Sequence, residues 1–241
     1  MPPLFVDLSH MLNADVQIYP GDPHFACCPV QTIPKDGNSV YGISMGTHTG
    51  THVDAPSHFI EDGSPIDQLP LSTFIGNAVI VDTRHKSAKD RIVWSDISGY
   101  EDVIRRKAAL EHGVFVFLHT GWSQYWKSET YYDHPFLDVE AAKKLLGLGV
   151  KVIGVDTLSP DETRVDGSMP DFAVHDVVLG AGVVIAENLT NLTALESGDW
   201  LVNLVPLKLG GLDGSPVRAF AWSPAHGCLY LDPQAKLPRS L

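Results

Sequence analysis

Three shortages in the sequence exclude several classes of protein. The 241 residues contain only three cysteines, and because Cys27 and Cys28 are adjacent, this odd set is a poor basis for a disulfide framework. Basic residues number 17 against 29 acidic ones, which gives a formal charge of −12, and no basic run is longer than Arg105-Arg106-Lys107. Nucleic acids and anionic membranes are bound by clustered cations, so we expect neither as a partner.

Long apolar runs are also lacking. No window of the sequence approaches the ~20 apolar residues of a membrane-spanning helix, and the opening Met1-Pro2-Pro3-Leu4 does not resemble a secretory signal. All three cysteines are therefore expected to be reduced thiols in a cytoplasmic protein. Hydrophobic residues nevertheless make up 44% of the chain, which is enough for a substantial core.

The pattern of apolar residues predicts a mixed α/β fold. Short β-branched runs predict strands at 4–8, 40–51, 78–82, 114–119, 150–155, 183–187 and 200–205, and longer periodic runs predict helices at 94–109 and 138–148. The second helix passes through a glycine turn into a buried strand, which is half of a βαβ unit. Turn residues such as Tyr19-Pro20-Gly21-Asp22-Pro23 suit hairpins near the N-terminus. No repeat or linker divides the chain, so residues 1–241 are expected to form one domain.

The most informative segment is Thr47-His48-Thr49-Gly50-Thr51-His52-Val53-Asp54. Gly50, the threonines and the following proline disfavour a helix, whereas strand alternation places residues 48, 50, 52 and 54 on one face. In that arrangement Gly50, which has no Cβ, leaves room for an ion between His48 and His52. Two imidazoles and a carboxylate without any thiolate form a ligand set suited to Zn²⁺, Mn²⁺ or Fe²⁺.

Further ligands are expected from elsewhere, because one aspartate neutralises only half of a divalent charge. Glu187 ends the apolar run 183–186, where an unpaired carboxylate pointing into the core is costly, and coordination to a cation would remove that cost. His175 lies in a similarly apolar stretch. Alternatively, Glu187 ends a solvent-facing strand and His175 lies on a helix surface. The candidate ligands for one ion, or for two ions sharing a carboxylate, are His48, His52, Asp54, His175 and Glu187.

His58 is the candidate acid or base. It follows the turn at Pro56, so it lies near the expected ion without having to bind it, and a free imidazole there is suited to proton transfer. The role of His119, at the end of a predicted strand, stays open. Trp122 and Trp126 are expected either in the wall of an aromatic pocket or in the core.

A serine hydrolase is the competing prediction. Gly42-Ile43-Ser44-Met45-Gly46 matches the G-x-S-x-G pattern of a nucleophile elbow. That motif needs a strand before it and a helix directly after it, but a strand-like segment rich in threonine and histidine follows here. A catalytic Ser44 is therefore disfavoured.

The histidine segment resembles the signature of a known family. His48-x-Gly50-Thr51-His52-x-Asp54-x-Pro56-x-His58-Phe59 meets every fixed position of the H-x-G-T-H-x-D-x-P-x-H-F signature of the cyclase-type metal-dependent hydrolases. That family includes bacterial kynurenine formamidase, isatin hydrolase and polyketide cyclases. The likeness extends to 19–23, to the predicted strand end at 154–159, and to the segment from His175 to Glu187-Asn188-Leu189.

The resemblance implies a role for each of these residues. His48, His52 and Asp54 would bind metal, His175 and Glu187 would complete a two-ion site, and His58 would be the catalytic imidazole. It also implies a swivelling β/β/α domain with a mixed sheet in a homo-oligomer, either a dimer or a tetramer. Formamidase-like members imply Zn²⁺ as the cofactor, and isatin hydrolase implies Mn²⁺.

The expected reaction is hydrolysis of an amide or cyclic amide bond in a small aromatic substrate of the N-formylkynurenine or isatin type. Metal-activated water would attack the carbonyl, and His58 would move the protons. Two alternatives stay open: a cyclase or lactone hydrolase in secondary or aromatic-compound metabolism, and a metal-binding relative without turnover. The second is disfavoured because a purely structural ion has no need of His58.

Overall fold

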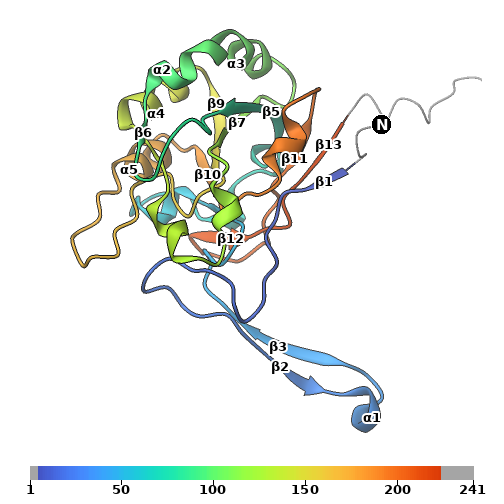
Figure 1. Ribbon diagram of the computed structural model, residues 1–241. Helices are drawn as coiled ribbons and strands as arrows, with labels where there is room; N and C mark the ends of the chain where they lie inside the picture. The colour runs from blue at the N-terminus through green and yellow to red at the C-terminus, as the bar shows by residue number, and fades with distance from the viewer. Residues whose placement is uncertain (1–4, 224–241) are drawn as a thin grey trace, which may run out of the picture.

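A nine-stranded mixed sheet organises the protein. A computed structural model describes residues 5–223 and is shown in Figure 1. The strands lie in the spatial order β1 (Phe5–Asp7), β13 (Phe220–Trp222), β11 (Leu201–Asn203), β5 (Ile75–Asp82), β7 (Val114–His119), β9 (Val150–Val155), β10 (Val184–Glu187), β4 (His52–Asp54) and β12 (Gly214–Pro216). The four neighbours from β5 to β10 are parallel, and the strands on either side are antiparallel. The predicted mixed α/β class is thereby confirmed.

Helices connect the parallel strands and cover one face of the sheet (Figure 1). Between β5 and β7 lie α2 (Trp94–Ile97), the 3₁₀ turn η4 (Ser98–Tyr100) and α3 (Glu101–Ala108); α4 (Val139–Gly147) precedes β9, and α5 (Ala173–Gly180) precedes β10. The βαβ unit predicted around α4 is present, since β7 and β9 pair in parallel. Asp138 caps α4 by accepting hydrogen bonds from the backbone of Glu140 and Ala141.

Strand alternation divides the interior into two apolar cores. In β7, Val116 and Leu118 face the helices, whereas Phe115 and Phe117 face the opposite side. Gly154 of β9 is required by this packing, because a Cβ there would lie 2.5 Å from the ring of Phe117. The sheet is therefore buried on both faces at its centre.

The helix predicted over 94–109 is interrupted. The chain forms the short α2, tightens into η4 at Ser98-Gly99, and resumes as α3. Serine and glycine are weak helix formers, so the helix breaks at a point where the apolar pattern predicted no end. Asp96 stabilises the start of α2 by accepting a hydrogen bond from the backbone of Val93 at 2.8 Å, and the helix begins at Trp94, as predicted.

A hairpin projects from the body as an arm (Figure 1). It consists of β2 (Ala26–Gln31), the single-turn helix α1 (Ile33–Asp36) and β3 (Val40–Ser44), and every residue of β2 is exposed. A hairpin near the N-terminus was predicted from the turn residues at 19–23, but the hairpin that forms turns at α1 instead. The strand expected over 40–51 ends at Ser44, where the chain turns through 46–49. Cys27 and Cys28 are free thiols on the arm, as expected, and Cys228 lies outside the described residues.

Shorter elements complete the chain. These are β6 (Arg91–Ile92), which pairs with β8 (Phe136–Leu137), and the 3₁₀ turns η1 (Pro56–His58), η2 (Ile66–Gln68), η3 (Leu71–Thr73), η5 (Trp122–Tyr125), η6 (Glu129–Asp133) and η7 (Leu192–Leu195). The strands predicted at 78–82, 114–119, 150–155 and 183–187 are present, and those at 4–8 and 200–205 are shorter than predicted. Within residues 5–223 no helix has the length and apolar character to cross a membrane.

Candidate metal centre and its pocket

Pairing of β4 with β10 places three of the candidate ligands together. His52 lies opposite Glu187, and Asp54 lies opposite Ile185. Because Val53 between them points into the core on one face, His52 and Asp54 project from the other face, toward α5. That helix carries His175, and one ligand atom each of Asp54, His175 and Glu187 lies within 4.8 Å of the other two. The predicted shared face is therefore correct for His52 and Asp54.

The ring of His52 is held by the backbone. Its Nδ1 donates a hydrogen bond to the carbonyl oxygen of Gly50 at 2.8 Å. In the neutral imidazole this bond keeps the proton on Nδ1 and leaves the lone pair on Nε2. Nε2 lies 3.2 Å from Asp54 Oδ1 and 3.3 Å from Glu187 Oε2, so it faces the carboxylates.

His175 is held in a similar way by Asp161. Its Nδ1 lies 2.6 Å from Asp161 Oδ2, and the same carboxylate accepts hydrogen bonds from the backbone of Val174 and His175 at the start of α5. Its Nε2 then lies 3.3 Å from Glu187 Oε1. His175 is only 4% exposed and Glu187 6%, so the alternatives of a helix-surface histidine and a solvent-facing glutamate are wrong.

His48 reaches the cluster from a turn, because β4 begins only at His52. Its Nδ1 lies 2.7 Å from Asp54 Oδ1, and one ligand atom each of His48, His52 and Asp54 lies within 4.8 Å of the others. The expectation that 48 and 50 share the strand face of 52 and 54 is therefore wrong. Gly50 has a φ of +68°, and a Cβ there would lie 2.4 Å from Leu12, so this glycine makes room for Leu12 and not for an ion.

His58 lies at the end of η1 and stacks on His48, with the ring centroids 3.9 Å apart. Its Nδ1 lies 3.2 Å from Asp213 Oδ2, and the same oxygen lies 2.9 Å from His48 Nε2. Ligand atoms of His48, His58 and Asp213 also lie within 4.8 Å of one another, so the geometry allows His58 to be either a ligand or a free imidazole. Thr47 Oγ1 donates to the second oxygen of Asp213 at 2.9 Å.

Sequence reasoning missed two carboxylates, Asp161 and Asp213. Each orients a histidine of the cluster, yet neither lies in a run that distinguishes it from a surface residue. Asp213 precedes β12, whose Gly214 pairs with Asp54 of β4. A Cβ at Gly214 would lie 2.8 Å from His48 Cε1, so the glycine after Asp213 makes room for His48, a contact that only the structure reveals.

The buried carboxylates stay ionised because imidazoles surround them. Burial by itself raises the pKa of Asp54, but the charge and hydrogen bonds of His52 and His48 hold it well below its usual value. Burial lowers the pKa of His175, yet Asp161 and Glu187 outweigh it and raise that pKa to about 10. The pKa of His48 rises to about 9 for the same reason, with Asp213 and Asp54 opposing burial. The cluster therefore requires positive charge, supplied by protons or by a cation.

Unsatisfied atoms test whether a divalent ion fits. Among the described residues, His52 Nε2, Asp54 Oδ2 and Glu187 Oε1 are buried and have no hydrogen-bond partner. Leaving one such group unsatisfied costs ~1–3 kcal/mol, and all three lie in the same cluster. One coordinated cation would satisfy them together. Imidazole nitrogens and carboxylate oxygens without thiolate match Zn²⁺ or Mn²⁺, so these residues fit a divalent metal.

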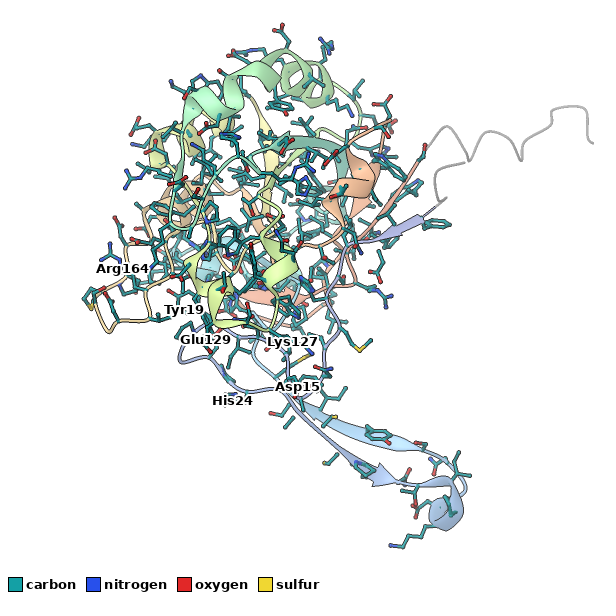
Figure 2. The ribbon with its side chains drawn as sticks, viewed as in Figure 1. Asp15, Tyr19, His24, Lys127, Glu129 and Arg164 are labelled. Atoms are coloured by element: carbon teal, nitrogen blue, oxygen red, sulfur yellow. The ribbon has the colours of Figure 1, made fainter. Side chains whose placement is uncertain are left out.

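A cavity of about 350 Å³ opens beside the cluster, with His58, His175 and Glu187 in its wall. Its apolar surface comes from Tyr19, Phe59 and Phe172, and the rings of Phe59 and Phe172 meet edge to face at 5.1 Å. Figure 2 places Tyr19 at the margin of the body, on the side of the arm. The volume is in the range that holds one small aromatic ligand.

Trp122 and Trp126 are not part of this cavity. Trp122 packs in a small cluster with Tyr131 and Leu158, and the ring of Trp126 stacks on His10 with the centroids 4.0 Å apart. Of the two predictions for these residues, the core position is correct for Trp122, and Trp126 packs beside it.

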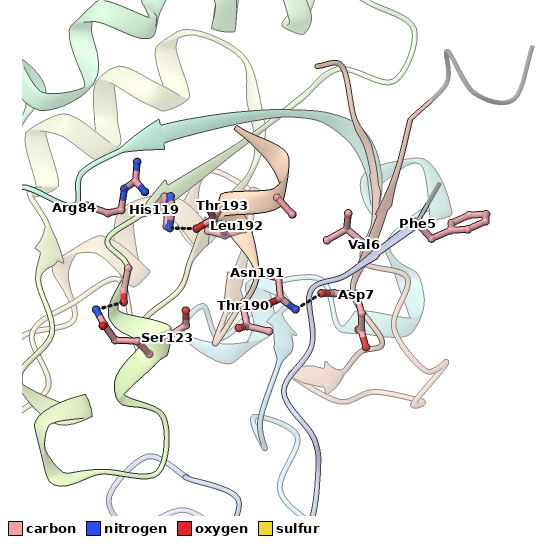
Figure 3. A pocket seen from close by; sticks show the side chains of 13 residues that line it. Phe5, Val6, Asp7, Arg84, His119, Ser123, Thr190, Asn191, Leu192 and Thr193 are labelled. Atoms are coloured by element: carbon pink, nitrogen blue, oxygen red, sulfur yellow. Dashed lines mark hydrogen bonds between the residues drawn. The ribbon is translucent and has the colours of Figure 1, made fainter. Parts of the chain in front are cut away.

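His119 lines a second, larger cavity of about 860 Å³ (Figure 3). Its Nε2 lies 3.4 Å from Thr193 Oγ1, and its Nδ1 lies 3.2 Å from Glu196 Oε1. None of the candidate metal ligands lines this cavity. The open question about His119 is thus resolved in favour of a buried residue at the end of β7, away from the metal cluster.

Ser44 lies outside both cavities. It is exposed at the end of β3, and the chain continues into a turn where a nucleophile elbow would need a helix. The structure therefore does not support a serine hydrolase at this motif.

Comparison with known proteins agrees with this site. Residues 6–162 match the family model Cyclase, described as "Putative cyclase". The kynurenine formamidase of Bacillus cytotoxicus is 33% identical over 217 residues, which cover 89% of this chain and 95% of that protein. Among solved structures, isatin hydrolase A from Labrenzia aggregata bound to benzyl benzoate superimposes with a TM-score of 0.78 at 26% identity, covering 91% of this chain and 93% of the other. A potential metal-dependent hydrolase with cyclase activity gives a TM-score of 0.69 at 26% identity, covering 91% and 97%.

Proposed function

Because this chain belongs to the cyclase family that also contains bacterial kynurenine formamidases, we propose that it is a metal-dependent hydrolase of carbon–nitrogen bonds. The substrate is a small aromatic amide or cyclic amide, of the N-formylkynurenine or isatin type. One observation carries the proposal: buried histidines and carboxylates with unpartnered atoms converge beside an aromatic-walled cavity. The substrate type is inferred from two similar proteins, a kynurenine formamidase and an isatin hydrolase.

The five candidate ligands hold one or two divalent cations in this proposal, either Zn²⁺ or Mn²⁺. Asp54 belongs to both ligand groups, the one with His48 and His52 and the one with His175 and Glu187, which supports two ions that share its carboxylate. When bound, such a cation supplies Lewis-acid chemistry, which polarises a carbonyl and lowers the pKa of water.

His58 is the acid and base of the proposed reaction. When its Nδ1 donates to Asp213, the lone pair of Nε2 is free to take a proton from the attacking water and return it to the leaving nitrogen. Tyr19, Phe59 and Phe172 hold the aromatic part of the substrate and exclude bulk water from the carbonyl. The isatin hydrolase neighbour favours a cyclic amide as the second candidate substrate, and lactone opening or ring closure would use the same groups.

Metal removal and restoration test the proposal. We expect chelation to lower turnover of an N-formyl aromatic amine, of isatin or of an aromatic lactone by at least ~100-fold, and either Zn²⁺ or Mn²⁺ to restore it. Elemental analysis verifies the metal content at each step. Full turnover by protein verified to be metal-free would refute metal dependence, and inactivity of every metal-loaded form on all three substrates would favour a metal-binding relative without turnover.

We also propose a homo-oligomer, dimer or tetramer, in which the arm packs on a second copy of the chain. The arm exposes several apolar side chains, namely Val30, Ile33, Val40, Tyr41 and Ile43. An isolated two-stranded hairpin is at best marginally stable in water, so a partner surface would stabilise it.

Residues 1–241 form a single domain in this proposal, since one sheet separates both main cores. A cytoplasmic location is proposed as well, because the exposed free thiols of Cys27 and Cys28 suit a reducing compartment. The partner is a small molecule, since the charge of −12 disfavours nucleic acid.

A further inference from the structure

Asn188 follows β10 directly and joins separate segments of the chain. It is 1% exposed and has a left-handed φ of +55°, a backbone conformation that asparagine tolerates better than most residues. Its backbone N–H donates to the carbonyl oxygen of Thr157 at 3.0 Å, and its carbonyl oxygen accepts from Thr51 Oγ1 at 2.6 Å. The backbone of Asn188 is therefore fixed, so its side-chain amide leaves the sheet in a defined direction.

The amide of Asn188 reaches the carbonyl that orients a candidate metal ligand. Its Nδ2 donates to the carbonyl oxygen of Gly50 at 3.0 Å, and the same oxygen accepts from His52 Nδ1 at 2.8 Å. A carbonyl oxygen has two lone pairs, so these two side chains use both of them. Gly50 lies in the turn before β4, and no backbone N–H within residues 5–223 donates to this oxygen. Its direction therefore depends on the amide.

Tyr131 holds the amide in that orientation. Its hydroxyl donates to Asn188 Oδ1 at 3.0 Å, and its ring is fully buried beside Trp122 and Leu158. Burial raises the pKa of Tyr131 well above its usual value, so the hydroxyl keeps its proton. A flipped amide would turn Oδ1 toward the Gly50 carbonyl, where two acceptor oxygens repel each other. The hydrogen bonds thus run from Tyr131 through Asn188 to Gly50.

We propose that Asn188 is a positioning residue of the metal centre, and that Tyr131 acts through it. The amide holds the Gly50 carbonyl, and that carbonyl holds the ring of His52 with Nε2 toward the carboxylates. Without the amide, the Gly50 carbonyl is free to rotate, because glycine restricts its backbone least, and His52 loses a fixed acceptor. The inference rests on the metal binding of the proposed function, and it adds residues that touch neither ion nor substrate.

Metal affinity tests the inference without turnover. Asn188→Gly removes both side-chain hydrogen bonds and accommodates the left-handed backbone. We expect its Kd for Zn²⁺, measured by competition with a chelator, to rise by ~10–100-fold, the range for loss of a group that orients a metal ligand. The visible absorption of the Co²⁺-loaded protein should also shift, because it reports the arrangement of ligands around the ion.

Tyr131→Phe removes only one hydroxyl. Its Kd for Zn²⁺ should rise by about 3- to 10-fold, as loss of one buried hydrogen bond provides. In the Asn188→Gly background the same change should add no more than about 2-fold, because no amide is left there for Tyr131 to orient. Additive rises in the double variant would show that Tyr131 does not act through Asn188.

Two controls match these variants. Asn191→Gly replaces an asparagine with a similar φ of +58°, whose Nδ2 donates to the carbonyl oxygen of Asp7 at 2.8 Å in the second cavity (Figure 3). Tyr132→Phe changes the neighbouring tyrosine of η6, which packs against the same small apolar cluster. Both should keep the Kd within about 2-fold of the wild type and leave the absorption unchanged. Circular dichroism and the melting temperature of the metal-free proteins verify folding.

Unchanged affinity and absorption in folded Asn188→Gly would overturn the inference, and if that variant does not fold, the same result in Tyr131→Phe would do so. A lower melting temperature without any change in the bound metal belongs to a purely structural contact and counts as the same outcome. Metal-dependent hydrolysis would then still stand, because the wild type binds its ion. Weaker metal binding in both variants of a protein that hydrolyses nothing would instead refute only the proposed reaction.

Discussion

At the scale of single residues, the site depends on carboxylates that orient imidazoles. Asp161 holds Nδ1 of His175, and Asp213 contacts both His48 and His58. The hydrogen-bonded nitrogen carries the proton, so the opposite nitrogen faces the reacting groups. Asp213 has its pKa held far below its usual value by the hydrogen bonds of His48 and His58, so it stays ionised as their partner.

Replacement of His58 separates proton transfer from metal binding. In His58→Ala we expect turnover to fall by ~10²–10⁴-fold, the range of a lost general acid or base, while the bound metal per chain stays the same. Steady-state kinetics and elemental analysis measure both quantities. His24→Ala, which removes an exposed histidine near the base of the arm, is the control and should retain wild-type values. Loss of metal from His58→Ala would make His58 a ligand and not a free imidazole.

The sequence predicted the candidate metal ligands better than the carboxylates that orient the histidines. His52, Asp54 and Glu187 could be found because each interrupts an apolar or β-branched context, where a charge needs a reason. Asp161 and Asp213 could not, since the contacts that explain them join residues 14 and 155 positions apart. Gly50 was noticed for the wrong reason: its left-handed backbone and its contact with Leu12 belong to a turn that strand alternation does not predict.

At the scale of elements, buried parallel strands were the most predictable and short helices the least. β7 is apolar from Val114 to Leu118, and β9 is interrupted only by the half-buried Lys151, a pattern typical of parallel strands covered on both faces. α5 was not predicted, because its sequence Ala173–Gly180 is apolar on most sides and lacks the periodic polar face of a surface helix. The break at η4 likewise depends on Ser98 and Gly99, which are weak helix formers. The apolar pattern of 94–109 continues across these residues and therefore predicted one unbroken helix.

The arm is the element whose stability should depend on association. Tyr41 and Ile43 lie two residues apart on β3, so they share a face, and they are 59% and 63% exposed. We expect Tyr41→Ser with Ile43→Ser to weaken self-association by at least ~100-fold in Kd, since buried aromatic and aliphatic anchors dominate such interfaces. Light scattering after size exclusion, over a dilution series, measures the mass.

Lys35→Ser, at the tip of the same arm in α1, is the matched control and should keep the wild-type mass. A wild-type protein that is monomeric at all concentrations would refute the homo-oligomer. An oligomer whose mass is unchanged in the double variant would place the interface elsewhere.

At the scale of the whole molecule, buried histidines couple stability to pH. Burial, aided by the charge of Lys127, lowers the pKa of His10 to about 4 from an ordinary value of 6.5. The unfolded chain therefore binds more protons than the folded chain between these values. The contribution of His10 is intact above pH 6.5 and is lost as the pH falls toward 4, by at most ~1.4 kcal/mol per pH unit.

His10→Phe isolates this effect, because the phenyl ring can stack on Trp126 as the imidazole does and cannot titrate. We expect the free energy of unfolding of His10→Phe to fall less than that of the wild type between pH 7 and pH 5, as urea denaturation with equal metal content would measure. The difference between the two proteins removes the contribution of the metal-site histidines. Parallel pH curves would show that His10 is not the group responsible.

The hydrogen bond that joins His48 to Asp213 spans 165 residues of sequence. During synthesis, His48 leaves the ribosome long before its partner exists, and β12, which flanks β4 in the sheet, is made later still. Contacts of such long range form only after the loop-closure entropy of the intervening chain has been paid. The full set of contacts at the metal centre therefore requires a chain that has been made as far as β12, so we expect the site to be completed after synthesis of that strand and not before it.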